Sequence, residues 1–200
     1  MIVIRPVPES PSLDDFTLWP VGSGPSPPLG GELTSDQVGA VVARIACYNE
    51  STADESLADP VARMLSGLLT EDAFVVAGGL RVEDTATGVV LEPGCCNGLE
   101  EWRSWLDIEF GEEPWLGHDP TPGAELIGTT VRLHPDAGQP GPVIELPPAD
   151  LLTLLAGVQR DLLAFLGLLA NWADRYAPGS AEALVAAFDR ALEITAAGTR

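Results

Sequence analysis

Apolar residues recur three and four positions apart within residues 34–50, which predicts an amphipathic helix. Thr34 and Gln37 open this segment with the spacing of a capping box, in which each side chain bonds the other residue's backbone. Asp59 and Pro60 predict a second helix through VARMLSGLL, because aspartate is a good N-cap and proline fits the first helical position.

The longest apolar stripe of the chain lies near its C-terminal end. It predicts a helix from Pro148 or Asp150 to about Tyr176, followed by a break at residues 178–179 and a last helix capped by Ser180. The face opposite the stripe is small and polar, which predicts close packing against the last helix or against a second chain. That face consists of Thr153, Ala156, Arg160, Ala164, Gly167 and Asn171.

Short apolar or alternating runs predict strands at residues 1–7, 73–84, 88–94, 124–136 and 142–147. The second and third runs form one predicted hairpin, and the fourth run folds on itself near Gly128 and Thr129. The first run is predicted to be an edge strand, because Pro6 cannot donate to a ladder. The fold class predicted is α+β, a small, mainly antiparallel sheet packed by helices, with two C-terminal helices.

Residues 8–31 are rich in proline and glycine. Because proline lacks an amide donor and glycine weakens regular structure, we predict an extended arm, anchored by Phe16, Leu18 and Trp19. We therefore expect residues 1–33 to form an N-terminal strand and arm, and residues 34–200 to form a single α+β domain.

The chain is strongly acidic, with 30 aspartates and glutamates against 10 basic residues and a formal net charge of −20. This charge disfavours binding to nucleic acid or anionic membranes and favours a basic protein partner. The N-terminal residues lack the pattern of a secretory signal, and Gln159, Arg160 and Asp161 interrupt the long apolar segment. Three cysteines, two of them adjacent, do not resemble a secreted disulfide framework. We expect a cytoplasmic protein whose long helix is buried.

The segment LEEWRSWLDIEF predicts a short amphipathic α-helix whose apolar stripe is Leu99, Trp102, Leu106 and Phe110. Trp105 is off this stripe and is expected to be exposed among carboxylates. Exposed tryptophan amid acids suits recognition of arginine or lysine through cation–π contacts and ion pairs. The candidate binding surface is Trp105, Glu109, Glu112, Glu113 and Trp115.

The adjacent cysteines Cys95 and Cys96 are interpreted first as small, buried side chains between a strand and the next helix. A metal site formed by Cys95, Cys96 and His118 is the alternative, and so is a thiol nucleophile activated by His118. A redox disulfide is disfavoured because adjacent cysteines close a strained ring. His118, beside Asp119, and His134 are interpreted as turn and loop residues. We assign no catalytic residue and expect no cofactor.

The motifs PGCCNGLEEWRSWL, EEPWLGHDP and VIELPPADLLTLLAGVQRDLLAFLGLLANWA resemble a family of uncharacterised bacterial proteins over roughly residues 73–176. That resemblance implies no activity. Small acidic α+β proteins are also broadly similar to immunity proteins of bacterial toxin systems, at the level of class. We expect a non-enzymatic, acidic protein-binding module of immunity type with a basic partner, and a homodimer is compatible with the small-residue face. The alternative is a metal-binding protein or a small enzyme that uses Cys95 or Cys96 with His118.

Overall fold

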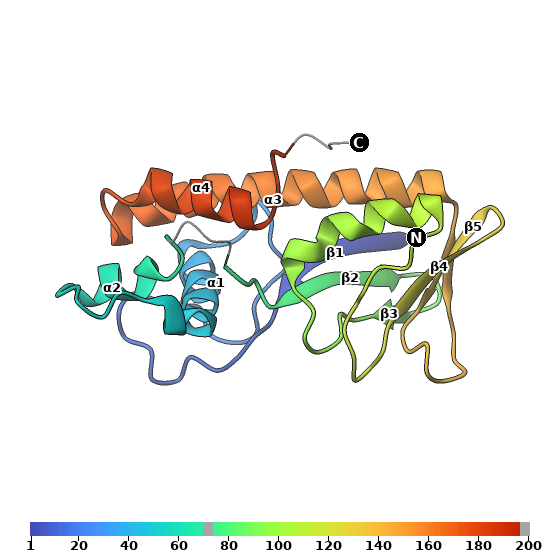
Figure 1. The fold of residues 1–200 in the computed structure, drawn as a ribbon, viewed down its shortest axis with the longest axis horizontal. Helices are drawn as coiled ribbons and strands as arrows, with labels where there is room; N and C mark the ends of the chain where they lie inside the picture. The colour runs from blue at the N-terminus through green and yellow to red at the C-terminus, as the bar shows by residue number, and fades with distance from the viewer. Residues whose placement is uncertain (70–73, 197–200) are drawn as a thin grey trace. The chain divides into compact units, whose positions relative to one another are not determined.

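A computed structural model of the chain describes residues 1–69 and 74–196. It confirms the α+β class, with two three-stranded antiparallel sheets where one sheet was expected. The elements, labelled where there is room in Figure 1, are β1 (Ile2–Pro8), α1 (Ser35–Tyr48), η1 (Glu50–Thr52), α2 (Pro60–Ser66), β2 (Gly78–Asp84), β3 (Val89–Leu91), η2 (Leu99–Phe110), β4 (Gly123–Ile127), β5 (Thr130–His134), β6 (Ile144–Leu146), α3 (Pro148–Tyr176) and α4 (Ala181–Ala191).

The chain divides into two compact units, each built from segments distant in sequence. The first unit comprises Met1–Val7 and Gly78–Arg160, and the second comprises Pro8–Ala77 and Asp161–Arg200. The first unit therefore contains both sheets and η2, while the second contains the arm, α1, α2 and α4. The division into an arm over residues 1–33 and a single domain over residues 34–200 stays a prediction.

The first sheet has the strand order β1-β2-β3, so β1 is an edge strand, as predicted. Beyond the end of β2, the amide of Thr85 donates to the carbonyl of Met1 at 2.9 Å. β2 and β3 form the predicted hairpin, with Val82 opposite Leu91 and both side chains fully buried. The amide of Gly88 closes the intervening turn on the carbonyl of Asp84 at 2.8 Å.

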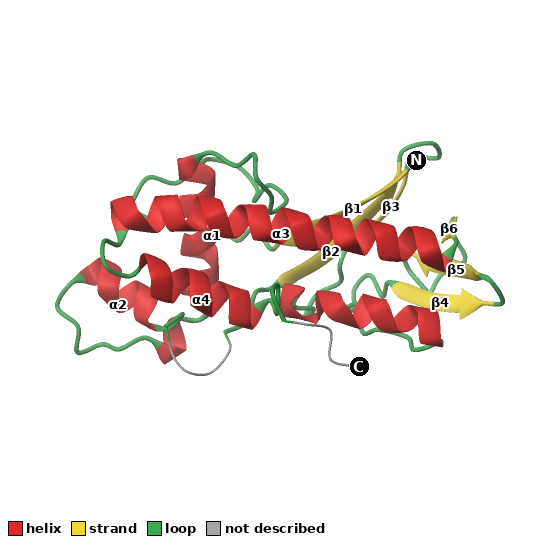
Figure 2. Cartoon of the chain, turned by 90° about the horizontal axis from the view of Figure 1, so that it is seen from above, coloured by secondary structure: helices red, strands yellow, loops and turns green. Residues whose placement is uncertain are grey.

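The second sheet has the order β4-β5-β6, and Figure 2 shows β4 and β5 side by side. Ile127 pairs with Thr130, so the hairpin turns at Gly128 and Thr129, as predicted. Gly128 has φ of 63°, a left-handed conformation that glycine adopts without steric cost. Alternate residues of the three strands form the buried face: Ala124, Val131, Leu133, Ile144 and Leu146.

The segment Leu99–Phe110 is a 3₁₀-helix, η2, where an α-helix was predicted. A 3₁₀-helix has three residues per turn, so its side chains stack at every third position. The buried side chains are Leu99, Trp102, Trp105 and Ile108. Leu99 and Trp102 of the predicted stripe are buried, but Phe110 is 65% exposed, so the second half of that stripe is wrong. Trp105 is only 2% exposed, so its predicted exposure is also wrong. η2 lies against β2 of the first sheet and β4 of the second.

In the second unit, α1 begins with the predicted capping box. Thr34 Oγ1 accepts from the amide of Gln37 at 3.3 Å, and Gln37 Oε1 accepts from the amide of Thr34 at 2.8 Å. α2 begins as predicted, with Asp59 accepting from the amide of Val61 at 3.1 Å. It ends earlier than predicted, at Ser66.

Trp19 anchors the proline-rich arm, as predicted. Its side chain is 5% exposed, its Nε1 donates to the carbonyl of Gly39 at 2.9 Å, and its ring lies 5.2 Å from that of Trp172. Phe16 packs edge-on against Trp19 with ring centroids 4.7 Å apart. Leu18 is 37% exposed and is therefore not an anchor.

The long helix α3 has the predicted bounds, and most of its predicted apolar stripe is buried. By length and composition, α3 is apolar enough to cross a membrane, with 33% of its most apolar window buried. The cytoplasmic location therefore stays a prediction. On the opposite face, a Cβ at Gly167 would meet no atom within 4 Å apart from its own chain neighbours and helix backbone, so the predicted close packing around Gly167 is not found among the described residues.

The last helix, α4, follows the break at Pro178 and Gly179 and buries the predicted inner stripe. Phe188 of this helix packs between Phe74, with ring centroids 4.9 Å apart, and Phe165, at 5.9 Å. Ser180 is the N-cap residue, but its side chain forms no capping hydrogen bond, which corrects the predicted cap. Tertiary packing therefore stabilises α4 where a local cap was expected.

Candidate thiolate and imidazole site

Two loops of the first unit meet in an isolated antiparallel bridge between Cys95 and His118. The amide of Cys95 donates to the carbonyl of His118 at 2.7 Å, and the amide of His118 donates to the carbonyl of Cys95 at 3.1 Å. Next to this pair, the amide of Gly94 donates to the carbonyl of Leu116 at 2.8 Å. Main-chain groups form all three hydrogen bonds, so this contact between the loops does not require their side chains. We call Gly94–Cys96 with Leu116–His118 the glycine clamp.

Two glycines allow the loops of the clamp to approach this closely. A Cβ on Gly94 would lie 2.5 Å from the backbone nitrogen of His118. A Cβ on Gly117 would lie 2.5 Å from the carbonyl carbon of Gly94, and Gly117 also has φ of 96°. Both positions therefore require glycine, because a Cβ at either would overlap the facing loop. Gly117 requires it also because its backbone has a positive φ.

The clamp places both thiols on the surface. Cys95 and Cys96 are exposed, so the prediction that they fill space between a strand and a helix is wrong. The clamp's close approach depends on its glycines. Adjacent residues of a regular strand point to opposite faces, but Cys96 has φ of 61°, which interrupts this alternation. As a result, the two Sγ atoms lie only 3.5 Å apart.

The imidazole of His118 joins this pair. One ligand atom from each of Cys95, Cys96 and His118 lies within 4.8 Å of the other two. His118 Nδ1 bonds Asp119 Oδ2 at 3.1 Å. The bond to Asp119 raises the pKa of His118, and a hydrogen bond with Cys96 raises that pKa further. An imidazole held by a carboxylate through one nitrogen is the arrangement that metal-binding histidines usually show.

Two thiols and one imidazole form a donor set with defined chemistry. Thiolates with imidazole suit zinc and copper(I), and a tetrahedral ion held by three protein ligands keeps a fourth position for water or an external ligand. A thiol beside a carboxylate-oriented imidazole is also an arrangement that can activate a nucleophile. Metal binding needs only the two thiols and the imidazole that the clamp brings together. Catalysis by an activated thiol needs a bound substrate as well.

The second histidine does not join the cluster. His134 Nε2 lies 2.9 Å from Glu125 Oε1 on the neighbouring strand, and Arg132 pairs with Glu145 at 2.8 Å on the same sheet. His134 ends β5 and lines a separate hollow with the loop that follows it. It is a strand-end residue in contact with Glu125, beside the loop in which the sequence placed it.

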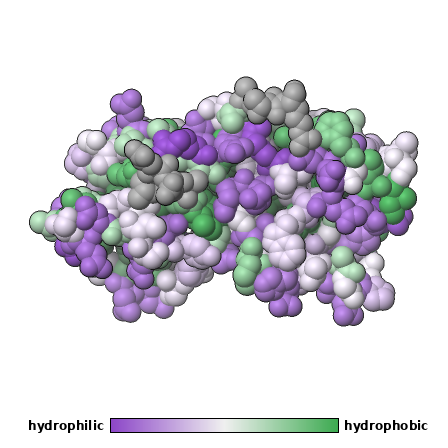
Figure 3. All heavy atoms as spheres, in the orientation of Figure 1, coloured by the Kyte–Doolittle hydropathy of each residue, from purple (hydrophilic) through white to green (hydrophobic). Residues whose placement is uncertain are grey.

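The predicted acidic surface is only partly found. Glu109, Glu112 and Glu113 are exposed, and Trp115 is 59% exposed. Trp105 is buried in η2 and does not belong to this surface, whereas Phe110, next to Glu109 in sequence, is exposed. The Trp115 ring lies 6.4 Å from the imidazole of His118. Hydrophilic residues cover much of the molecular face in Figure 3.

Arg44 is an important residue that sequence reasoning missed. It is 6% exposed, and its guanidinium donates to the carbonyl of Pro11 at 3.0 Å, to Ser26 Oγ at 2.9 Å and to the carbonyl of Gly24 at 2.7 Å. Burial lowers its pKa. The sequence feature that could have indicated its burial was its position as the one charged residue in the apolar run VGAVVARIA.

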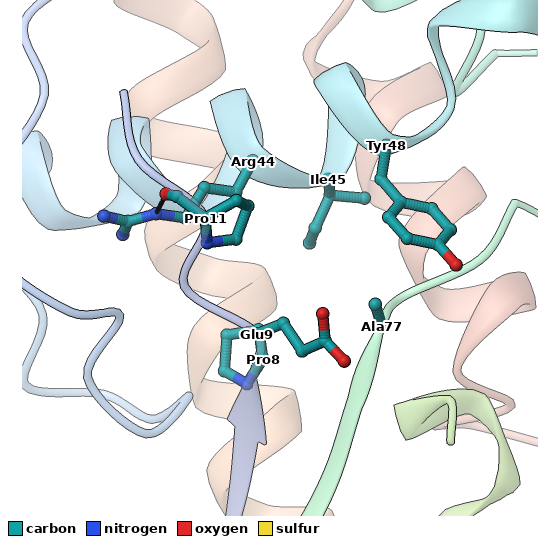
Figure 4. A pocket seen from close by; sticks show the side chains of 7 residues that line it. All are labelled: Pro8, Glu9, Pro11, Arg44, Ile45, Tyr48 and Ala77. Carbon is teal, nitrogen blue, oxygen red and sulfur yellow. Dashed lines mark hydrogen bonds between the residues drawn. The ribbon is translucent and has the colours of Figure 1, made fainter. Parts of the chain in front are cut away.

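A small hollow lies beside Arg44, in the second unit. Figure 4 shows the guanidinium turned toward Pro11, with Glu9, Tyr48 and Ala77 among the other lining residues. The hollow has a volume of about 20 Å³, which accommodates a water molecule but no organic ligand. Arg44 stabilises the arm through its three hydrogen bonds.

Comparison with protein families, curated proteins and solved structures finds no match to this chain. The resemblance to uncharacterised bacterial proteins stays an expectation.

Proposed function

We propose that this protein binds a thiophilic transition-metal ion through Cys95, Cys96 and His118. The observation that carries the proposal is that one ligand atom from each residue lies within 4.8 Å of the other two, on loops joined by main-chain hydrogen bonds. This proposal takes up the alternative from the sequence, because both cysteines are exposed where burial was expected.

The clamp supports the proposal despite the unusual spacing of the cysteines. Structural zinc sites commonly separate two cysteines by two to four residues, so that both sulfurs can face one ion. Here the left-handed turn at Cys96 achieves a similar result for adjacent residues, with the sulfurs 3.5 Å apart. The main-chain bridge supplies the third ligand from a separate loop. Zinc or copper(I) is the expected class of ion.

The metal content of the protein, purified without chelator, tests the proposal directly. We expect about one zinc ion per chain by elemental analysis, and sulfur-to-metal charge-transfer absorption after exchange with cobalt(II). Cys95→Ser, Cys96→Ser and His118→Ala should each weaken binding strongly. Cys47→Ser is the matched control, since it removes a cysteine of the other unit. Absence of bound metal, or equal binding by all four variants, would contradict the proposal.

A second candidate function is the binding of a basic protein, as in the immunity-type module expected from the sequence. The observation that favours it is that Phe110 and Trp115 are 65% and 59% exposed and lie within three residues of Glu112 and Glu113 in sequence. Exposed aromatic rings beside carboxylates can bind arginine through cation–π contacts and ion pairs.

An arginine-rich peptide, followed by tryptophan fluorescence, tests this second candidate. Reversing the charge of Glu112 and Glu113 should slow association more than reversing Glu182 of α4 and Glu193, which follows α4, because neither control residue has an exposed tryptophan beside it in sequence. Salt should slow association for the wild type, because exposed charges are screened over about 8–10 Å near physiological ionic strength. A salt-independent rate, or equal losses from both pairs, would remove the argument for a basic partner.

A further inference from the structure

The two thiols of the clamp have a geometry that permits a second chemistry. Their Sγ atoms lie 3.5 Å apart, and a disulfide requires about 2.05 Å, so bond formation needs a local shift of roughly 1.5 Å. Both residues are exposed, so a small oxidant can reach them. The third cysteine, Cys47, belongs to the other unit.

The backbone arrangement favours reaction between these two sulfurs. In an extended strand, neighbouring side chains point apart, and adjacent cysteines rarely meet. The positive φ of Cys96 removes that obstacle before any oxidation occurs. The amide and carbonyl of Cys95 are held by His118 at 2.7 and 3.1 Å, so Cys95 keeps its position while Cys96 adjusts.

We propose that Cys95 and Cys96 form a reversible disulfide when a hydroperoxide oxidises them, and that this reaction releases the bound metal. The thiol chemistry stands on the geometry of the sulfurs, while the release of metal rests on the proposed function. Oxidation removes two of the three ligands at once, because a disulfide sulfur is no longer a thiolate.

The reaction proceeds in two steps. One thiolate attacks the terminal oxygen of the hydroperoxide, the O–O bond breaks, the alcohol or water leaves, and a sulfenic acid forms. The neighbouring thiolate then attacks that sulfur, the S–S bond forms, and hydroxide leaves and is protonated to water. In total, two thiols and one hydroperoxide yield one disulfide, one alcohol and one water.

The disulfide should be easy to reduce. Adjacent cysteines close a strained ring, and strained or exposed disulfides have more oxidising potentials than buried structural ones. An external dithiol should therefore restore both thiols by exchange and return the protein to its metal-binding form. The strain that disfavours this bond as a permanent crosslink makes it suitable as a reversible one.

Hydrogen peroxide tests the proposal in a Cys47→Ser background, where the clamp supplies every thiol. We expect loss of both titratable thiols, a mass lower by two hydrogen atoms, and a Cys95–Cys96 crosslinked peptide after digestion. A dithiol should reverse each change. Zinc-loaded protein should release its zinc to a chromogenic chelator as the thiols disappear, and circular dichroism should show that the fold persists.

The outcomes separate this proposal from metal binding. Gain of oxygen atoms without crosslinking, or crosslinking only between molecules, would overturn the proposed disulfide even where zinc binds normally. Retention of zinc by the crosslinked protein would overturn the release step. Crosslinking in a protein that never binds zinc would overturn the proposed function and the release step while supporting the thiol chemistry. Cys95→Ser is the control, since that background then holds a single cysteine and no intramolecular disulfide can form.

Discussion

The glycine clamp and the Arg44 anchor both join segments distant in sequence, but they use opposite parts of the chain. In the clamp, backbone amides and carbonyls form the bonds, and two glycines supply the room. At Arg44, one long side chain forms three bonds to the arm and is buried in doing so. Backbone hydrogen bonds hold the clamp without requiring its side chains. The contact at Arg44, in contrast, engages the donors of the side chain itself.

This difference shows where chemistry can arise in the molecule. The hydrogen bonds of the clamp come from the backbone, including that of Cys95 and His118, so the thiols and the imidazole can change their bonding while the loops stay in register. The guanidinium of Arg44 is surrounded by acceptors of its own unit, beside a hollow of only about 20 Å³. The three hydrogen bonds of this buried guanidinium connect α1 to the arm.

The largest expected effect comes from Gly117→Ala, which disrupts the close backbone contact of the clamp. The new Cβ would lie 2.5 Å from the carbonyl carbon of Gly94, at a residue with φ of 96°. We expect a loss of about 3 kcal/mol or more in the free energy of unfolding, from overlap and backbone strain together, with a large loss of zinc affinity. Denaturant unfolding and a zinc titration measure these effects.

Gly88→Ala is the matched control for that variant. Gly88 also has a positive φ, 76°, but its Cβ would meet no atom of the described residues within 4 Å. Gly88→Ala should lower the free energy of unfolding by about 1 kcal/mol, from backbone strain alone, and should leave zinc binding normal. Equal effects from the two variants would mean that close approach of the loops is not what the clamp requires.

The next effect comes from Arg44→Met, which removes the anchor but keeps an apolar stem. Three acceptors lose their partner, for an expected loss of about 2–4 kcal/mol in the free energy of unfolding. Proteases should cut within residues 8–31 more readily, while zinc binding should persist. The exposed Arg160→Met serves as control. An arm that resists proteolysis as well as in the wild type would show that Trp19 holds it without Arg44.

A smaller effect, an increase in stability, is expected at Gly167, where an added Cβ would have open space around it. Gly167→Ala should stabilise α3 by up to about 1 kcal/mol, because alanine loses less backbone entropy and its methyl meets open space. The melting temperature checks this expectation, and Gly167→Leu should also be tolerated. Destabilisation by either substitution would indicate that a second chain covers this face, as the sequence first suggested.

The smallest effect concerns Cys47, the thiol outside the clamp. Burial raises the pKa of Cys47, and the nearby charge of Glu50 raises it further, so less thiolate exists at neutral pH. Alkylation of Cys47 should therefore be slow and should quicken as the pH rises. Glu50→Gln should speed it a few-fold, since a partly exposed charge has a modest influence. Alkylation rates in a Cys95→Ser, Cys96→Ser background measure this, and an unchanged rate would leave burial as the sole cause.

Much of the fold could be predicted because local signals specify it. The capping box at Thr34, the Asp59–Pro60 helix start, the turn at Gly128 and the bounds of α3 depend on residues within a few positions of one another. The error at η2 has a physical cause. Its apolar residues fit a period of three and a period near 3.6 almost equally well over so short a segment, and packing against β2 and β4 accompanies the shorter period.

The sequence by itself determined which groups the chain carries: the acidity, the three cysteines, and the apolar periodicity that places most helices and strands. The tertiary structure alone decided which of those groups meet. Cys96 and His118 belong to different loops, and no local pattern reports that Gly94 and Gly117 let the loops touch. The exposure of both thiols and the burial of Arg44 follow from the same physical fact: proximity between distant segments depends on how whole elements pack, whereas periodicity and capping depend on immediate neighbours.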